Sequence, residues 1–209
     1  MLRLYDFWES GNCYKVRLLL SQLRIPFERV ALDILAGETR RPAFLAKNPN
    51  GRVPLVEWPD GRRLAESNAI LVYLAEGTPL LPADAFERAQ ALQWMFFEQY
   101  SHEPYIAVVR FWHFAGLVET NRAALPDKVE RGYQALAVME RHLAAHAFFA
   151  GERYTVADIA LYAYTHVAGE GGFELRRFPA VERWLARVRD QPGHVAITDE
   201  VGTPASLDG

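Results

Sequence analysis

The stretch ESGNCYKVRLLL, from Glu9 to Leu20, lies where a strand is expected to end and a helix to begin. Leu2–Tyr5 before it is short and largely apolar, which predicts a strand. Tyr14–Arg24 carries valine and leucine at helical spacing, which predicts a helix with one apolar face. Ser10 and Asn12 are therefore expected in a loop at the carboxyl end of a strand, where open sheets usually bind their ligands.

Residues 1–77 predict a small α/β domain with the element order β-α-β-α-β-β-α. A helical crossover makes the first two strands parallel neighbours, and Pro59-Asp60-Gly61 predicts a hairpin between the last two. Besides the two elements above, the expected strands are Phe27–Asp33, Val53–Trp58 and Arg62–Ala65, and the expected helices are Pro42–Lys47 and Ser67–Glu76.

Gly77 and the prolines Pro79 and Pro82 predict a linker over residues 78–85, and residues 86–209 predict an all-helical domain. The polar residues Thr198–Gly209 at its end predict a frayed tail. The expected helices are Phe86–Ala115 with a kink at Pro104, Asp127–His146, Val156–Val167 and Pro179–Arg189.

Composition narrows the classes of partner. The net charge of −3 gives no electrostatic reason to expect a nucleic-acid partner. No apolar run approaches the roughly 20 residues of a membrane span, and the N-terminus lacks the pattern of a signal peptide. A single cysteine, Cys13, cannot form an internal disulfide, which is typical of a reducing compartment. We therefore expect a cytoplasmic protein without a membrane or nucleic-acid partner.

The helix that follows Ser10 offers unpaired N–H groups and a positive dipole end, which favour an anion such as a thiolate. A thiol has a pKa of about 8.5, and lowering this by two units requires roughly 2.7 kcal/mol. One hydrogen bond to the anion supplies about 1.5–3 kcal/mol, and the Ser10 hydroxyl or the Asn12 amide could donate it. The alternative is that Ser10 only caps the helix.

Four motifs in order resemble the bacterial glutathione S-transferase family. The chain is most similar to its serine-type members, such as the theta and zeta classes, with some nu-like character. The resemblance implies a thioredoxin-like N-terminal domain and a helical C-terminal domain. The motifs are SGNCYKVRLLL (Ser10–Leu20), NPNGRVP (Asn48–Pro54), ESNAILVYL (Glu66–Leu74) and YTVADIALYAY (Tyr154–Tyr164).

The resemblance implies catalytic roles for Ser10 and Asn12. Ser10 stands where the serine classes keep the hydroxyl that activates the thiolate, and Asn12 stands where some bacterial members use an asparagine; the choice between the two donors stays open. Cys13 falls three residues after the position of the nucleophile in cysteine-type members. It is therefore expected to be a small buried residue, and dithiol chemistry is excluded, although glutathione-based disulfide chemistry is not.

A glutathione cradle is also implied. Val53-Pro54 matches the family's cis bond, which would direct the Val53 backbone toward the ligand; the alternative is an ordinary edge-strand proline. Glu66 would accept from the α-ammonium of the glutamyl group, and Ser67 with the helix N–H groups would bind its carboxylate, although both also suit a plain helix start. Arg52 matches a basic position that contacts glutathione, or is simply an exposed loop residue.

An apolar electrophile pocket is predicted from aromatic residues. Phe7 and Trp8 neighbour Ser10, and Tyr105 and Trp112 share a helix face with Val109. The alternative for the helical set is plain helix–helix packing. Arg110 on the same helix is expected to be exposed; the alternative is that it binds an anionic group of the electrophile.

Two further patterns predict structure rather than chemistry. Thr155 and Asp158 have the spacing of a capping box. His142 and His146 have metal-ligand spacing but no visible third ligand, so no metal is expected.

The function that best fits these features is a glutathione transferase that activates the glutathione thiolate for attack on a hydrophobic electrophile. The resemblance also implies a homodimer. The alternatives are a glutathione-dependent disulfide or peroxide reductase, and a non-catalytic regulatory or binding protein of the same fold.

Overall fold

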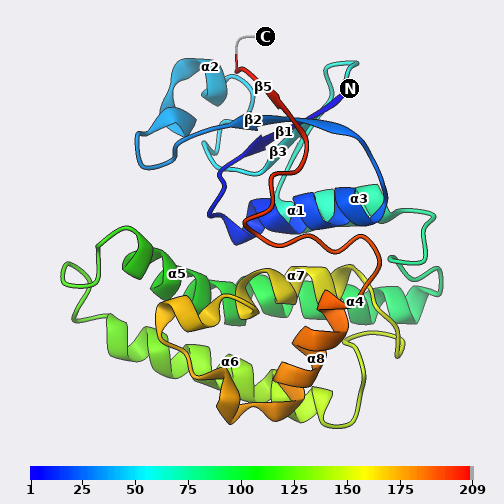
Figure 1. Cartoon of the computed structure of the whole chain (residues 1–209), viewed down its shortest axis with the longest axis vertical. Coiled ribbons are helices and arrows are strands. Elements are labelled where there is room, and N and C mark those ends of the chain that lie inside the picture. Colours follow the sequence, from blue (N-terminus) through cyan, green and yellow to red (C-terminus); the bar gives the residue numbers. More distant parts are fainter. Residues whose placement is uncertain (208–209) are drawn as a thin grey trace. The chain divides into compact units, whose positions relative to one another are not determined.

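The computed structural model describes residues 1–207, and the chain divides into two compact units. The first unit contains Met1–Glu76 together with the chain from Pro192 onward, and the second contains Gly77–Gln191. The expected order of an α/β domain followed by a helical one is confirmed (Figure 1).

The first unit is built on a five-stranded sheet with the order β4-β3-β1-β2-β5. Strands β1 and β2 are parallel, and β3 is antiparallel to both β1 and β4, so the predicted crossover and hairpin are both present. Its elements are β1 (Leu2–Asp6), α1 (Gly11–Gln22), β2 (Phe27–Ala31), α2 (Pro42–Leu45), β3 (Leu55–Glu57), β4 (Arg63–Ala65), α3 (Ser67–Ala75) and β5 (Thr203–Ala205).

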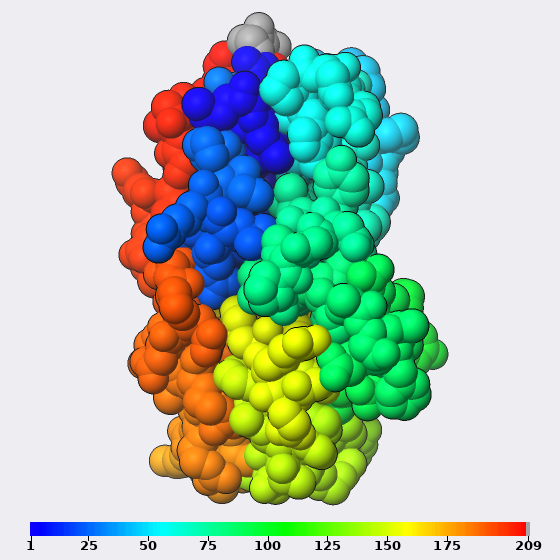
Figure 2. Space-filling model, turned by 90° about the vertical axis from the view of Figure 1, so that its right-hand side faces the viewer, coloured from blue at the N-terminus to red at the C-terminus, as the bar shows by residue number. Residues whose placement is uncertain are grey.

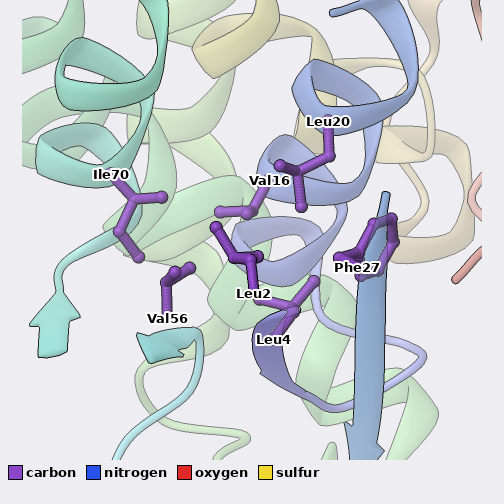
Figure 3. Packing of buried hydrophobic residues seen from close by; sticks show 7 residues of the cluster. All are labelled: Leu2, Leu4, Val16, Leu20, Phe27, Val56 and Ile70. Carbon is purple, nitrogen blue, oxygen red and sulfur yellow. The ribbon is translucent and has the colours of Figure 1, made fainter. Parts of the chain in front are cut away.

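Each face of this sheet has its own core, because successive side chains of a strand point to opposite faces. Helices α1 and α3 lie side by side over one face, and α2 lies on the other (Figure 1). Figure 3 shows the side chains of the first face pointing toward one another: Leu2, Leu4, Val16, Leu20, Phe27, Val56 and Ile70. The second face packs Tyr5, Val30, Leu32, Phe44 and Leu55.

Strand β5 differs from the frayed tail that the sequence predicted. Thr203–Ala205 pairs in parallel with β2, with Glu28 opposite Thr203. Without β5, the outer edge of β2 would present unpaired backbone groups. The C-terminal segment lies against the N-terminal part of the chain (Figure 2), and the Tyr14 hydroxyl donates to the Val195 carbonyl at 2.7 Å. The last two residues of the predicted tail, 208 and 209, lie outside the described residues.

The second unit is helical and is organised around α7 (Val156–Thr165), in which every residue is buried. The predicted capping box is present at its start: Thr155 accepts from the Ala157 N–H, and Asp158 accepts from the Thr155 N–H. None of the helices in residues 1–207 is both long and apolar enough to cross a bilayer. The other helices are α4 (Ala85–Phe97), α5 (Glu103–Phe114), α6 (Leu125–Leu143) and α8 (Pro179–Arg189).

The single long helix predicted over Phe86–Ala115 is interrupted. A π-helical turn, Glu98–His102, separates α4 from α5, and Pro104 lies in the first turn of α5. Proline lacks an N–H group, and its ring clashes with the carbonyl four residues earlier, so the wider turn accommodates it. The predicted break is therefore real, but it takes the form of a π turn just before the proline.

Candidate active site

The residues predicted to bind and activate glutathione all belong to the first unit. They come from the loop between β1 and α1, the turn before β3, and the start of α3. These residues are Ser10, Asn12, Arg52, Val53, Pro54, Glu66 and Ser67.

Ser10 is the N-cap of α1. Its Oγ accepts from the Cys13 N–H at 3.3 Å, and its own N–H donates to the Phe7 carbonyl at 2.9 Å. A hydroxyl that accepts in this way keeps its proton for a second partner. The structural role and the proposed chemical role of Ser10 are therefore compatible.

Asn12 joins the start of α1 to the start of α3. The Ser67 hydroxyl donates to Asn12 Oδ1 at 3.2 Å, although the two residues are 55 positions apart in the chain. The structure thus brings one predicted thiolate donor into contact with one predicted carboxylate ligand.

Glu66 precedes α3 with a backbone φ of 65°, in the region that favours glycine. Its side chain is exposed and makes no capping hydrogen bond to the helix. The first N–H groups of α3 are therefore not satisfied by the residue before it, an arrangement suited to an anion.

The turn before β3 is shaped by Asn48. Asn48 Nδ2 donates to the Arg52 carbonyl at 2.8 Å, and its Oδ1 accepts from the Asn50 N–H at 3.1 Å. The Val53–Pro54 peptide bond that follows is cis, as the resemblance implied. Arg52 is exposed.

Cys13 is fully buried, as expected. Its Sγ accepts from the Phe7 N–H at 3.4 Å. Burial and the neighbouring Asp6 carboxylate raise the pKa of the Cys13 thiol, so it stays protonated and unreactive.

Arg17 is a buried residue that the sequence analysis did not single out. Its guanidinium donates to the Trp8 carbonyl at 2.8 Å and to the Asp6 carboxylate at 3.4 Å. The guanidinium carbons of Arg17 and Arg29 each lie 4.4 Å from the centre of the Trp8 ring. Trp8, predicted to line an electrophile pocket, is therefore held in a cationic cluster that fixes the loop carrying Ser10.

Asp6 completes this cluster at the end of β1. Burial raises the pKa of the Asp6 carboxyl, although the charges of Arg17 and Arg29 oppose the change. Its Oδ1 has no hydrogen-bond partner in the structure.

Lys15 is a second buried residue that sequence reasoning missed. Its side chain is fully buried in α1, and its Nζ donates to Ser67 Oγ and to Asn68 Oδ1, each at 3.4 Å. One signal could have found it: Lys15 shares a helix face with Leu18 and Leu19, where a solvated charge is not expected.

The remaining predicted pocket residues, Tyr105 and Trp112, belong to the second unit, whereas Phe7 and Trp8 belong to the first. The Tyr105 ring faces α6, with Lys128 Nζ 5.1 Å from its centre, and Val109 is fully buried. Trp112 is half-buried on the same helix. These contacts favour helix packing as the role of Tyr105 and Val109.

Arg110 is buried, so its predicted exposure is wrong. Its Nε donates to Glu170 at 2.6 Å, in the 3-10 turn Ala168–Gly171. A buried guanidinium is stable there because it is paired with a carboxylate.

The two histidines with metal-ligand spacing have other partners. His142 Nε2 lies 3.1 Å from the Phe148 carbonyl oxygen, and His146 is hydrogen-bonded to Glu152. Within residues 1–207, no three His, Cys, Asp or Glu side chains form a group that could hold a metal ion.

Comparisons with known proteins extend over both units. A family model for the glutathione S-transferase N-terminal domain matches residues 1–76, and one for the C-terminal domain matches residues 90–192. Among curated proteins, the disulfide-bond oxidoreductase YfcG of Escherichia coli is 30% identical over 223 residues, covering 99% of each chain.

Two solved structures show the same fold. The glutathione S-transferase from Pseudomonas fluorescens Pf-5 is 53% identical with a TM-score of 0.93, covering 95% of this chain and 99% of its own. Ure2p in complex with glutathione is 26% identical with a TM-score of 0.84, covering 92% of this chain and 95% of its own. With both domain models matched in order, this chain belongs to the glutathione S-transferase family.

Proposed function

We propose that this protein is a glutathione transferase that ionises the thiol of bound glutathione for attack on an apolar electrophile. The observation that carries the proposal is the hydrogen bond between Ser67 and Asn12. It joins a predicted ligand of the glutamyl carboxylate to a predicted donor for the sulfur, as one tripeptide spanning both would require. The glutathione-bound Ure2p structure supports the choice of ligand.

In this proposal, glutathione lies along the first unit as an extended peptide. Its γ-glutamyl carboxylate binds the Ser67 N–H and the other open N–H groups at the start of α3, and Glu66 accepts from its ammonium group. The Val53 backbone, next to the cis peptide bond, pairs with the cysteinyl part, and exposed Arg52 contacts the ligand beside it.

The chemical step needs no ionisation of a protein group. The proton of the glutathione thiol leaves to solvent, and hydrogen bonds from Ser10 or Asn12 and the positive end of the α1 dipole stabilise the thiolate. The thiolate sulfur then forms a bond to an electrophilic carbon near Phe7, and the leaving group departs with the electron pair of the broken bond. Positioning of the two reactants supplies the rest of the acceleration.

Reduction of disulfides is a second candidate. The similarity to a disulfide-bond oxidoreductase over 99% of the chain favours it. Here the glutathione thiolate attacks a disulfide sulfur, forms a mixed disulfide and releases the other sulfur as a thiolate. Cys13 takes no part in either reaction because it is buried and protonated.

We also propose that two copies form a dimer. Large aromatic side chains are exposed on α4 and the π turn: Phe96 is 71% exposed and Tyr100 is 84% exposed. They are four residues apart, so they neighbour each other on the helix surface. Light scattering of the wild type and of a Phe96→Asp variant tests this: a dimer that dissociates in the variant supports it, and a monomeric wild type contradicts it.

The main test follows ultraviolet thiolate absorbance as glutathione is added to the protein. We expect binding with thiolate formation below pH 8, and weaker thiolate absorbance in Ser10→Ala or Asn12→Ala. Thr155→Ala is the matched control for Ser10→Ala, because it removes another N-cap hydroxyl at a cost of about 1 kcal/mol.

The outcomes separate the candidate functions. No binding of glutathione to the wild type would support the regulatory alternative and refute the proposal. A loss of thiolate in only one of the two site variants identifies the main donor. Assays with a chlorinated aromatic, an organic peroxide and a small disulfide then distinguish conjugation from reduction.

A further inference from the structure

We propose that Asn48 is a positioning residue of the glutathione site: its carboxamide holds the Arg52 carbonyl inside the turn before β3 and so directs the Val53 N–H toward the cysteinyl carbonyl of glutathione. The inference rests on the proposed function and deepens it, because it assigns the group that orients one of the predicted ligand contacts. Asn48 is buried, and it acts on the ligand only through the backbone that it holds.

The peptide unit that joins Arg52 to Val53 carries both groups of interest, the Arg52 carbonyl and the Val53 N–H. This peptide bond is trans, since the cis bond of the turn is the next one, Val53–Pro54. In a planar trans peptide the carbonyl and the N–H point in opposite directions. A partner that fixes the Arg52 carbonyl on one side of the chain therefore fixes the Val53 N–H on the other.

Asn48 is that partner, and its carboxamide has one possible orientation. Its Nδ2 donates to the Arg52 carbonyl oxygen at 2.8 Å, and its Oδ1 accepts from the Asn50 N–H at 3.1 Å. A backbone carbonyl can only accept and a backbone N–H can only donate, so a flipped carboxamide would lose both bonds. The backbone of the turn thus fixes the Asn48 side chain, and the Asn48 side chain fixes the Arg52 carbonyl.

The backbone of Asn48 is anchored to the core of the first unit. Its N–H donates to the Phe44 carbonyl at 2.9 Å, and its carbonyl accepts from the Gly51 N–H at 2.9 Å. Phe44 is fully buried, and its ring packs edge-on against the Tyr5 ring with centres 5.8 Å apart. The position of the Arg52 carbonyl is therefore set by the sheet core rather than by the exposed part of the loop.

The Val53 N–H is the group that this arrangement leaves for a ligand. No hydrogen bond among residues 1–207 uses this N–H, although the Arg52 carbonyl before it is bound and Leu55 after it is paired with Tyr5 in the sheet. Val53 is half-buried, and a donor there gains from a partner that replaces water. A donor that is already oriented also binds at a lower entropic cost than one that must be ordered on binding.

The test compares the affinity for glutathione, measured by calorimetry, of the wild type and Asn48→Asp. Aspartate has nearly the same shape and keeps an oxygen for the Asn50 N–H, but its second oxygen repels the Arg52 carbonyl. We expect about tenfold weaker binding, and a KM for glutathione raised to the same extent. Both kcat at saturating glutathione and the pKa of the bound thiol should change little, because Ser10 and Asn12 are intact.

Asn50→Asp is the matched control for the added charge. Asn50 is exposed in the same turn, so this variant places a negative charge two residues away while the bond from Asn48 to the Arg52 carbonyl stays; glutathione affinity should change less than about twofold. Asn48→Ala removes the donor without adding a charge, and it should weaken glutathione binding about tenfold even if Asn48→Asp does not fold. Its control is Asn121→Ala, which removes a similar bond, 2.9 Å to the Leu117 carbonyl, in the second unit and should leave the affinity unchanged.

A second ligand, γ-glutamylcysteamine, tests whether Asn48 acts through the Val53 N–H. This thiol keeps the γ-glutamyl group and the sulfur of glutathione but lacks the cysteinyl carbonyl and the glycine. We expect Asn48→Ala to weaken glutathione about tenfold and γ-glutamylcysteamine less than about twofold. An equal loss for both ligands would overturn the proposal, as would an unchanged affinity for glutathione in the Asn48 variants. Absence of glutathione binding to the wild type would instead refute the proposed function, and this inference with it.

Discussion

The starts of α3 and α7 solve the same problem in opposite ways. Each helix begins with N–H groups that have no partner inside the helix. At α7, Thr155 and Asp158 satisfy these groups reciprocally, and Asp158 also accepts from the Trp184 indole at 2.9 Å and the Phe149 N–H at 3.2 Å. At α3, Glu66 has a φ of 65° and makes no capping bond.

The difference shows how one chain separates stability from binding. The closed helix start lies in the buried centre of the second unit, where an unsatisfied group would be costly. The open start lies beside the candidate active site, where a ligand can supply the missing partner. Variants at the two helix starts should therefore fail in different assays.

The largest expected effect is on stability, at α7. Asp158→Ala leaves the donors of Trp184, Thr155 and Phe149 without their acceptor in a buried place. We expect a loss of about 3–5 kcal/mol in the free energy of unfolding, measured with urea. Asp127→Ala, which breaks an exposed pair with Arg131 in the same unit, should cost less than about 1 kcal/mol. Equal losses in the two variants would mean that the hydrogen bonds of buried Asp158 stabilise the unit no more than an exposed ion pair does.

The free energy of unfolding, measured over a series of pH values, tests the closed start of α7 further. Burial raises the pKa of Asp158 to about 7, although hydrogen bonds from Trp184 and Thr155 oppose the change. In the unfolded chain the pKa of an aspartate is about 3.9. The protonated Asp158 carboxyl therefore stabilises the folded state fully below about pH 4, and this stabilisation is lost as the pH rises through about 7. The wild type should therefore exceed Asp158→Asn in stability most at pH 5 and least at pH 8. A difference that grows with pH would show that the hydrogen bonds keep the carboxyl ionised.

The smallest expected change in stability is at α3. Glu66→Gly relieves a backbone conformation that costs a non-glycine residue about 1–3 kcal/mol, partly offset by the greater freedom of glycine in the unfolded chain. We expect the free energy of unfolding to rise by about 1 kcal/mol and glutathione affinity to fall about tenfold, measured by urea unfolding and calorimetry.

Arg24→Gly is the control for Glu66→Gly. Arg24 is exposed, has a φ of 55° and belongs to the same unit, but it is not a predicted site residue. Arg24→Gly should raise the free energy of unfolding by relieving a positive φ, as Glu66→Gly does, without a change in glutathione affinity. Loss of affinity in both variants would mean that glycine loosens the unit as a whole.

Most of the fold could be predicted because its elements carry strong local patterns. Strand β2 and the β3–β4 hairpin have clear apolar spacing and turn residues, and the capping box locates the start of α7. Strand β5 has only three residues, one of them Pro204, and exists because the edge of β2 accepts it. No local pattern in residues 203–205 could predict that they pair with β2.

The site was predicted in part, for a related reason. Ser10, Asn12 and Ser67 stand at helix starts, which the sequence locates well. Lys15, Arg17 and Arg110 resemble solvated charges in the sequence, yet all three are buried. Their burial depends on partners far along the chain, such as Ser67 for Lys15 and Glu170 for Arg110, and such pairings follow only from the tertiary structure.

Strand β5 has a consequence for how the protein is made. The first unit is completed by residues that are synthesised only after the whole helical unit. Until then, the nascent sheet ends at β2 with an open edge that another strand could pair with. A fragment cut at residue 76 would keep every predicted glutathione ligand but would lack β5, so its sheet would end at the open edge of β2.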